Sequence, residues 1–334
     1  MRRIVNKKLR LTVLKLKRYL RPDFFMTKER IHGHICIFAA NVIFGIYIPI
    51  SKYMLSNFLS GEVLTLFRMW GATAIFWIAS IFVRGDKVDK RDILLMMFFG
   101  LFGIALNQGL FISGLGMTSP VDASVIVTAT PLMVMVIAAV FMRDPITRRK
   151  GIGVFLGASG ALWLVFSTNH IQNSTGTFGG DMVILLSGLS TAIYYSLSKP
   201  LTSRHSPITL MKWMFLFSSI FLLPFTPSFL SSPKAFVGSF SAEAAFGLIY
   251  IVVGATFITY LLIAMAIKRM RPTTMAMYNY VQPFISSLVA VIVGQDSFSA
   301  EKCCAAVLVF FGVYLVTSSV NPLQSAETKK TETT

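Results

Sequence analysis

Three ionisable side chains stand inside long apolar stretches of this sequence: Lys52, Arg68 and Asp122. A charge in such surroundings is costly, so each is a functional candidate by default. A guanidinium can bind a carboxylate through paired hydrogen bonds, and a carboxyl group among apolar residues can carry a proton. We therefore predict that Arg68 and Asp122 either bind a substrate carboxylate and a proton or form a packed ion pair. Lys52 either joins this cluster or extends to the aqueous interface.

Neutral polar and aromatic residues form a second group of candidates, deeper in the apolar stretches. Pro131 and Pro283 each remove a backbone donor and break a helix, which is tolerated only against a cavity or packed protein. The polar and aromatic candidates are Asn107, Gln108, Thr128, Tyr194, Tyr195, Thr256, Tyr260, Tyr278, Asn279 and Gln282. Any one of them could form a hydrogen bond between helices instead of contacting a substrate. As a set they predict a pocket of modest polarity that is rich in aromatic side chains.

Motifs for bond-making chemistry do not occur in the sequence. It contains no HExxH motif, no cluster of His or Cys with metal-ligand spacing, and no phosphate-binding GxxxxGK[ST] loop. The cysteines, Cys36, Cys303 and Cys304, fall within apolar stretches and supply no disulfide framework. We therefore expect no enzyme, no metal and no cofactor.

The composition predicts a membrane protein. Of 334 residues, 54% are hydrophobic and 13% are charged, whereas a soluble domain has about 25% charged residues; the mean hydropathy is +0.68. A helix of roughly 20 apolar residues crosses a bilayer. We predict an all-α integral membrane protein with ten transmembrane helices, at 34–56, 61–84, 92–115, 119–142, 149–167, 180–200, 208–230, 242–268, 272–294 and 302–320.

The positive charge follows the order of these spans. The net charge is +17, which could indicate nucleic-acid binding, but 27 of the 31 Lys and Arg residues fall on one side when the N-terminus is taken as cytoplasmic. Lys and Arg collect on the cytoplasmic side of membrane proteins. We therefore expect the lipid bilayer and no nucleic acid as partner, with both termini in the cytoplasm. Residues 1–25 either lie on an anionic leaflet or precede a true start at Met26.

The second half of the sequence repeats the first. A shift of 152 residues brings Pro120 onto Pro272, Pro131 onto Pro283 and Gly160 onto Gly312, and a shift of 147 brings Tyr47 onto Tyr194. Five helices per half place the second copy upside down, and the charge bias of corresponding loops is swapped. Inverted repeats are typical of transporters that open alternately to either side. We predict a basic segment at 1–33, repeats at 34–167 and 180–320, an extracytoplasmic linker at 168–179 and a polar cytoplasmic tail at 321–334.

These residues resemble the EamA family of the drug/metabolite transporter superfamily. The resemblance rests on NVIFGIYIPISK, Arg68, the segment ending at Pro131 and RDPITRRKGIGVFLGASG, in an order that recurs in the second half. It implies a secondary transporter that exports amino acids or related metabolites across the cytoplasmic membrane by alternating access. Protons are the candidate coupling ion. Gly153, Gly157 and Ala161 form a small-residue row, which indicates close packing within the bundle or, as the alternative, a homodimer face. The alternative is a carrier of nucleotide sugars or phosphorylated sugars from the same superfamily.

Overall fold

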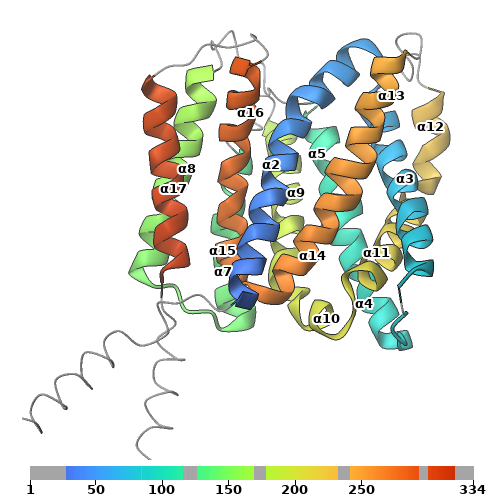
Figure 1. Cartoon of the computed structure of the whole chain (residues 1–334), viewed down its shortest axis with the longest axis horizontal. Helices are drawn as coiled ribbons and strands as arrows, with labels where there is room; N and C mark the ends of the chain where they lie inside the picture. The colour runs from blue at the N-terminus through green and yellow to red at the C-terminus, as the bar shows by residue number, and fades with distance from the viewer. Residues whose placement is uncertain are drawn as a thin grey trace, which may run out of the picture.

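The computed structural model describes residues 28–83, 85–115, 117, 126–168, 178–231, 241–292 and 300–319. Within these ranges the chain forms helices and no β-strand. The axes of the long helices are roughly aligned, and the helices lie side by side in one bundle (Figure 1). The prediction of an all-helical protein is therefore confirmed for this part of the chain.

Two helices of the first half have a defined end residue. Ser60 accepts a hydrogen bond from the backbone N–H of Val63 and so caps the second long helix, and Arg143 ends the fourth in the left-handed conformation. The elements of this half are α2 (Lys28–Asn57), α3 (Gly61–Ile81), α4 (Lys90–Gly100), the π-helix η1 (Leu101–Leu106), α5 (Asn107–Leu115), α7 (Thr130–Met142) and α8 (Arg148–Thr168).

The second half uses the same devices. Ser206 and Ser241 cap helices through the N–H groups of Thr209 and Ala244. The elements are α9 (Phe178–Leu197), α10 (Lys199–Arg204), α11 (Pro207–Leu222), the 3-10 helix η2 (Leu223–Phe225), α12 (Thr226–Leu230), α13 (Ala242–Ile249), the π-helix η3 (Tyr250–Ile258), α14 (Thr259–Arg269), α15 (Pro272–Met277), the 3-10 helix η4 (Tyr278–Tyr280), α16 (Val281–Ile292) and α17 (Ala300–Thr317).

Six helices in the described part of the chain are long and apolar enough to cross a membrane. They are Lys28–Leu55, Gly61–Ile81, Lys90–Gly114, Phe178–Leu197, Pro207–Phe225 and Ala242–Arg269. Thr130–Met142 and Cys303–Thr317 are shorter apolar helices. By length and composition this is the pattern of a protein that crosses the bilayer several times.

The boundaries differ from the predicted spans in two ways. The first described helix already includes residues 28–33, which were predicted to precede the first span. Glu29, in this part of α2, pairs with Arg269 of α14. Four predicted spans are not regular α-helices along their whole length: η1, η2, η3 and η4 interrupt them. A 3.6-residue hydrophobic pattern does not reveal such one-turn irregularities.

Glycines allow the last helices of the two halves to approach closely. A Cβ atom on Gly312 of α17 would lie 2.6 Å from the backbone oxygen of Gly153 in α8, and one on Gly160 would lie 2.7 Å from the oxygen of Ala305. A Cβ on Gly157 would meet the Tyr280 ring at 2.6 Å. The small-residue row of α8 thus contacts helices of its own chain, and the homodimer stays a prediction.

Candidate functional site

Arg68 is the centre of a buried polar cluster. It lies on α3, and 3% of it is exposed. Its Nε donates to Thr256 Oγ1 at 3.0 Å, and its Nη1 donates to Tyr47 Oη at 3.0 Å and to Gln108 Oε1 at 2.8 Å. The guanidinium also lies over the Tyr47 ring, 4.8 Å from its centroid. Three helices and a π-helix therefore meet at one side chain.

The partners of Arg68 are themselves held in place. Gln108 Nε2 donates to Tyr260 Oη at 3.0 Å, which fixes its amide so that Oε1 faces the guanidinium. Thr256 is fully buried, and its hydroxyl donates to the carbonyl of Ile251 at 2.8 Å while it accepts from Arg68. These bonds give the guanidinium one defined orientation. We call Arg68, Tyr47, Gln108, Thr256 and Tyr260 the arginine cluster.

Both π-helices lie beside the arginine cluster. η1 ends directly before Asn107 and Gln108, and η3 contains Thr256 and ends two residues before Tyr260. In η3 the hydroxyls of Thr256 and Thr259 each donate to the carbonyl five residues earlier, at 2.8 and 3.0 Å. A π-turn rotates the following residues relative to a regular helix and is common at functional sites. Here it turns polar side chains towards Arg68.

The charge of Arg68 is balanced by no carboxylate among the described residues. The acceptors that it reaches are hydroxyls and one amide oxygen, all neutral. Within the same residues no atom pairs with Nη2, whose two N–H groups are left to bind something else. A buried cation is costly unless an anion accompanies it. The arrangement is therefore suited to an anionic group small enough to reach the Nη2 edge of the guanidinium.

Asn107 is adjacent to the cluster in sequence but takes part in a different contact. Its Nδ2 donates to the hydroxyls of Ser187, at 3.1 Å, and Thr191, and Ser187 returns a bond to its carbonyl at 2.8 Å. These bonds join α5 to α9. Tyr194 and Tyr195 lie further along α9 and are buried, with 1% and 7% exposed.

A second group of predicted residues lies between α2 and the helices that follow residue 272. His34 Nδ1 lies 2.8 Å from Tyr278 Oη, and Gln282 Nε2 donates to Asn41 Oδ1 at 2.7 Å. Asn279 is half-buried in η4 beside them. In the part of the chain that the structure describes, no hydrogen bond joins this group to the arginine cluster.

Pro131 and Pro283 occupy corresponding places in the two halves, and so do Thr128 and Tyr280. Pro131 is the second residue of α7 and Pro283 the third of α16. The carbonyl of Thr128 accepts a 2.8 Å bond from Tyr280 Oη. The Tyr280 hydroxyl thus bridges the backbone just before one proline to the 3-10 turn just before the other.

Two predicted members cannot be placed. Asp122 lies outside the described residues, as does the side chain of Lys52. Tyr47, His34 and Asn41 take part in the contacts although they were not among the predicted site residues. Asn41 and Tyr47 are polar groups within an apolar run, which is the signal that could have identified them.

One end of the bundle is held by ion pairs. Asp92 of α4 contacts His205 Nε2 at 2.7 Å and Arg204 at 3.2 Å, and Lys150 of α8, only 1% exposed, contacts Asp144 at 2.7 Å. On the loop before α4, the backbone N–H of Ser206 donates to Asp86 and lowers the pKa of that carboxyl. This end of the bundle is the lower one in Figure 1, where α2 and α4 start and where α10 lies.

Known proteins resemble this chain in sequence and in fold. An uncharacterized transporter of Archaeoglobus fulgidus is 25% identical over 84% of this chain and 97% of its own length. A probable terminal-alkyne amino-acid exporter of Streptantibioticus cattleyicolor is 24% identical over 53% of this chain and 59% of its own. A solved crystal structure superposes with a TM-score of 0.73 at 15% identity, covering 86% of this chain and 97% of that one.

The family comparison covers nearly all the described helices. The sequence model of the EamA-like transporter family matches twice, at residues 31–166 and 178–318. Together with the six apolar helices, this makes the chain a multi-pass membrane protein with a transport role. The chain belongs to the EamA-like transporter family.

Proposed function

We propose that this protein is a secondary transporter that exports a small carboxylate-bearing metabolite, an amino acid or a related compound. The observation that carries the proposal is Arg68: a buried guanidinium held by neutral groups, with Nη2 free to bind among the described residues. An N–H group of Nη2 can donate a charge-assisted hydrogen bond to a carboxylate oxygen, and the guanidinium charge balances that of the carboxylate. The name of the Streptantibioticus relative, an amino-acid exporter, supports the same substrate class.

We further propose that the chain consists of ten transmembrane helices in two inverted repeats, at 34–167 and 180–320. The double family match supports this division. The π-helix η1 shifted by 152 residues falls within η3, and the two hydrogen-bonded pairs Gln108–Tyr260 and Thr128–Tyr280 are also 152 residues apart. Residues at equivalent positions contact each other where a pseudo-twofold axis passes. The Gly160–Ala305 and Gly312–Gly153 contacts exchange under the same shift.

Alternating access follows from such an arrangement, because two related halves can rock about a site on their common axis. The arginine cluster draws Tyr47, Arg68 and Gln108 from the first half and Thr256 and Tyr260 from the second. A substrate held there would contact both halves and respond to their relative motion.

The orientation follows from charge. The end of the bundle with Lys150, Arg204 and Arg269 would face the cytoplasm of the cell membrane, since Lys and Arg collect on that side. The segments 1–33 and 321–334 would lie on the same side and 168–179 on the other. Protons remain the candidate coupling ion, with Asp122 as their carrier.

A carrier of nucleotide sugars or phosphorylated sugars is the alternative. Phosphate groups with two or more negative charges call for several cations facing the substrate. Among the described residues, Arg68 is the one cation in the arginine cluster. One guanidinium matches one carboxylate, so the carboxylate reading is favoured.

Metabolite profiling tests the proposed function. Culture media of cells that overproduce the wild-type protein are compared with media of cells that produce Arg68→Gln at an equal membrane level. We expect one or a few carboxylate-bearing compounds to accumulate outside only with the wild-type protein. Accumulation of sugar phosphates, or equal accumulation with the variant, would reject the assignment.

A further inference from the structure

Tyr194 has a buried hydroxyl without a partner among the described residues. The residue is 1% exposed, and its Oη makes no hydrogen bond within that part of the chain. The ring lies directly against Gly103 of η1, where a Cβ would approach Tyr194 Cγ to 2.6 Å. A phenol hydroxyl normally finds a partner when buried, and leaving one unpaired destabilises the folded state.

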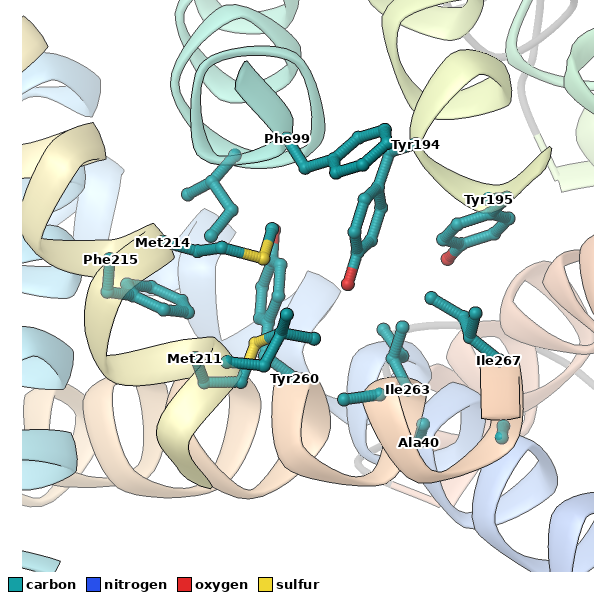
Figure 2. Packing of buried hydrophobic residues seen from close by; sticks show 14 of the residues in the cluster. Ala40, Phe99, Tyr194, Tyr195, Met211, Met214, Phe215, Tyr260, Ile263 and Ile267 are labelled. Carbon is teal, nitrogen blue, oxygen red and sulfur yellow. The ribbon is translucent and has the colours of Figure 1, made fainter. Parts of the chain in front are cut away.

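The surroundings of this hydroxyl are apolar and polarisable. Figure 2 shows it pointing from α9 into the region between Tyr260, Met211 and Ile263, which come from α11 and α14. Phe99 and Tyr195 lie beside the Tyr194 ring, with centroids 6.4 and 5.8 Å away. Tyr260 belongs both to this group and to the arginine cluster. The two regions are therefore neighbours.

The repeat explains why the hydroxyl lacks a partner. Tyr194 corresponds to Tyr47, whose hydroxyl accepts from Arg68. Ser60 caps α3 and Ser206 caps α11, and counting eight residues from each cap leads to Arg68 in one repeat and to Met214 in the other. The second half keeps the tyrosine and replaces its cationic partner by a fully buried methionine.

We propose that the substrate site has two unlike lobes and that Tyr194 binds the end of the substrate opposite its carboxylate. The inference rests on the proposed function, because the carboxylate is taken to bind Arg68. The Met211, Met214 and Tyr260 side chains accept an apolar body, and the Tyr194 hydroxyl supplies one hydrogen bond to a neutral polar group at its far end. The substrate class is thus a monocarboxylate with an apolar chain that ends in a hydroxyl, carbonyl or amide.

A second carboxylate would be excluded from this lobe. It would lie among methionine and aromatic side chains with one hydroxyl as its only donor among the described residues, and an ionised group in such surroundings is costly. In this structure the Tyr194 hydroxyl is enclosed, so the substrate reaches it when α9 and α14 separate in the transport cycle.

Thermal-shift titration of the purified full-length protein tests the inference. The probes are matched acids that differ in one far hydroxyl, namely phenylalanine with tyrosine and valine with threonine, and the dicarboxylates aspartate and glutamate. We expect the wild-type protein to prefer the hydroxyl-bearing member of at least one pair by about tenfold and to bind neither dicarboxylate. Tyr194→Phe should abolish that preference, and Tyr314→Phe, which alters an exposed tyrosine of α17, should retain it.

The outcomes separate this inference from the proposed function. If no probe binds, or if binding does not depend on Arg68, the proposed function fails and this inference fails with it. If the acids bind through Arg68 but Tyr194→Phe keeps the preference, only the inference on Tyr194 is overturned. Without ligand, Tyr194→Phe should melt at the wild-type temperature or above it, because an unpaired hydroxyl is removed; a clearly lower melting temperature would show that the hydroxyl already has a partner.

Discussion

Replacing Arg68 by lysine separates the charge of this side chain from its shape. Lysine keeps the positive charge but presents one ammonium group in place of the planar fork. The structure leaves both N–H groups of Nη2 for the substrate, and uses Nε and Nη1 for Thr256, Tyr47 and Gln108. Arg68→Lys therefore removes the charge-assisted bond that Nη2 directs at a carboxylate and loosens the cluster that orients it.

The expected loss follows from the value of one such bond. A hydrogen bond between charged groups contributes about 1.5–3 kcal/mol, which corresponds to roughly 10- to 150-fold in affinity. We expect the dissociation constant of the best-binding amino acid or 2-oxo acid to rise by that factor. The carboxamide of the same compound should bind weakly to both proteins, because it lacks the charge that the guanidinium recognises.

The assay is equilibrium binding to purified protein in detergent, with size-exclusion chromatography to verify folding. Arg204→Lys is the matched control, because Arg204 forms an ion pair with Asp92 outside the arginine cluster and its side chain is 60% exposed. An Arg68→Lys protein that is folded and binds the acid within threefold of wild type would refute the role given to the guanidinium.

Three further predictions concern stability in detergent. Gly312→Ala should lower the free energy of unfolding by about 1–3 kcal/mol, because its Cβ would lie 2.6 Å from a backbone oxygen of α8. Gly151→Ala is the control and should not lower it, because a Cβ there has nothing within 4 Å. Equal melting temperatures of the two variants would contradict the close packing. Lys150→Met should lower the free energy of unfolding by about 3–5 kcal/mol, because it leaves Asp144 without its buried partner. Adding Asp144→Asn to this variant should recover much of the lost stability. A double variant no more stable than Lys150→Met would count against the ion pair. The pKa of Asp86 is lowered from its ordinary 3.8 by a backbone N–H. Its contribution to stability is therefore present above pH 3.8 and is lost as the pH falls through the pKa of the folded state. Asp86→Asn should flatten the acid limb of a plot of melting temperature against pH, and an unchanged plot would refute the role of Asp86.

The sequence predicts the all-helical class because long apolar runs are typical of helices buried in lipid or protein. The irregular segments η1, η2, η3 and η4 were not predicted, since short π and 3-10 segments leave the overall hydrophobic pattern intact. Pro131 and Pro283 mark the neighbourhood of such turns, but η1 and η3 contain no proline.

Arg68 could be singled out from sequence because a buried charge is expensive wherever it occurs. Its partners could not be identified in the same way. Tyr47, Gln108 and Thr256 are 21, 40 and 188 residues away, and their meeting depends on how each helix is rotated about its axis. Asn107 and Gln108 illustrate this point, because neighbouring residues of one helix face α9 and α3 respectively.

The most direct test of the account is efflux from proteoliposomes. Vesicles that contain the purified protein are loaded with a mixture of amino acids, 2-oxo acids and sugar phosphates, and the loss of each compound is followed by mass spectrometry against protein-free vesicles. The account predicts faster loss of one or more monocarboxylates with wild-type protein and a return to the protein-free rate with Arg68→Gln. Loss of sugar phosphates instead, or equal loss with both proteins, would contradict it.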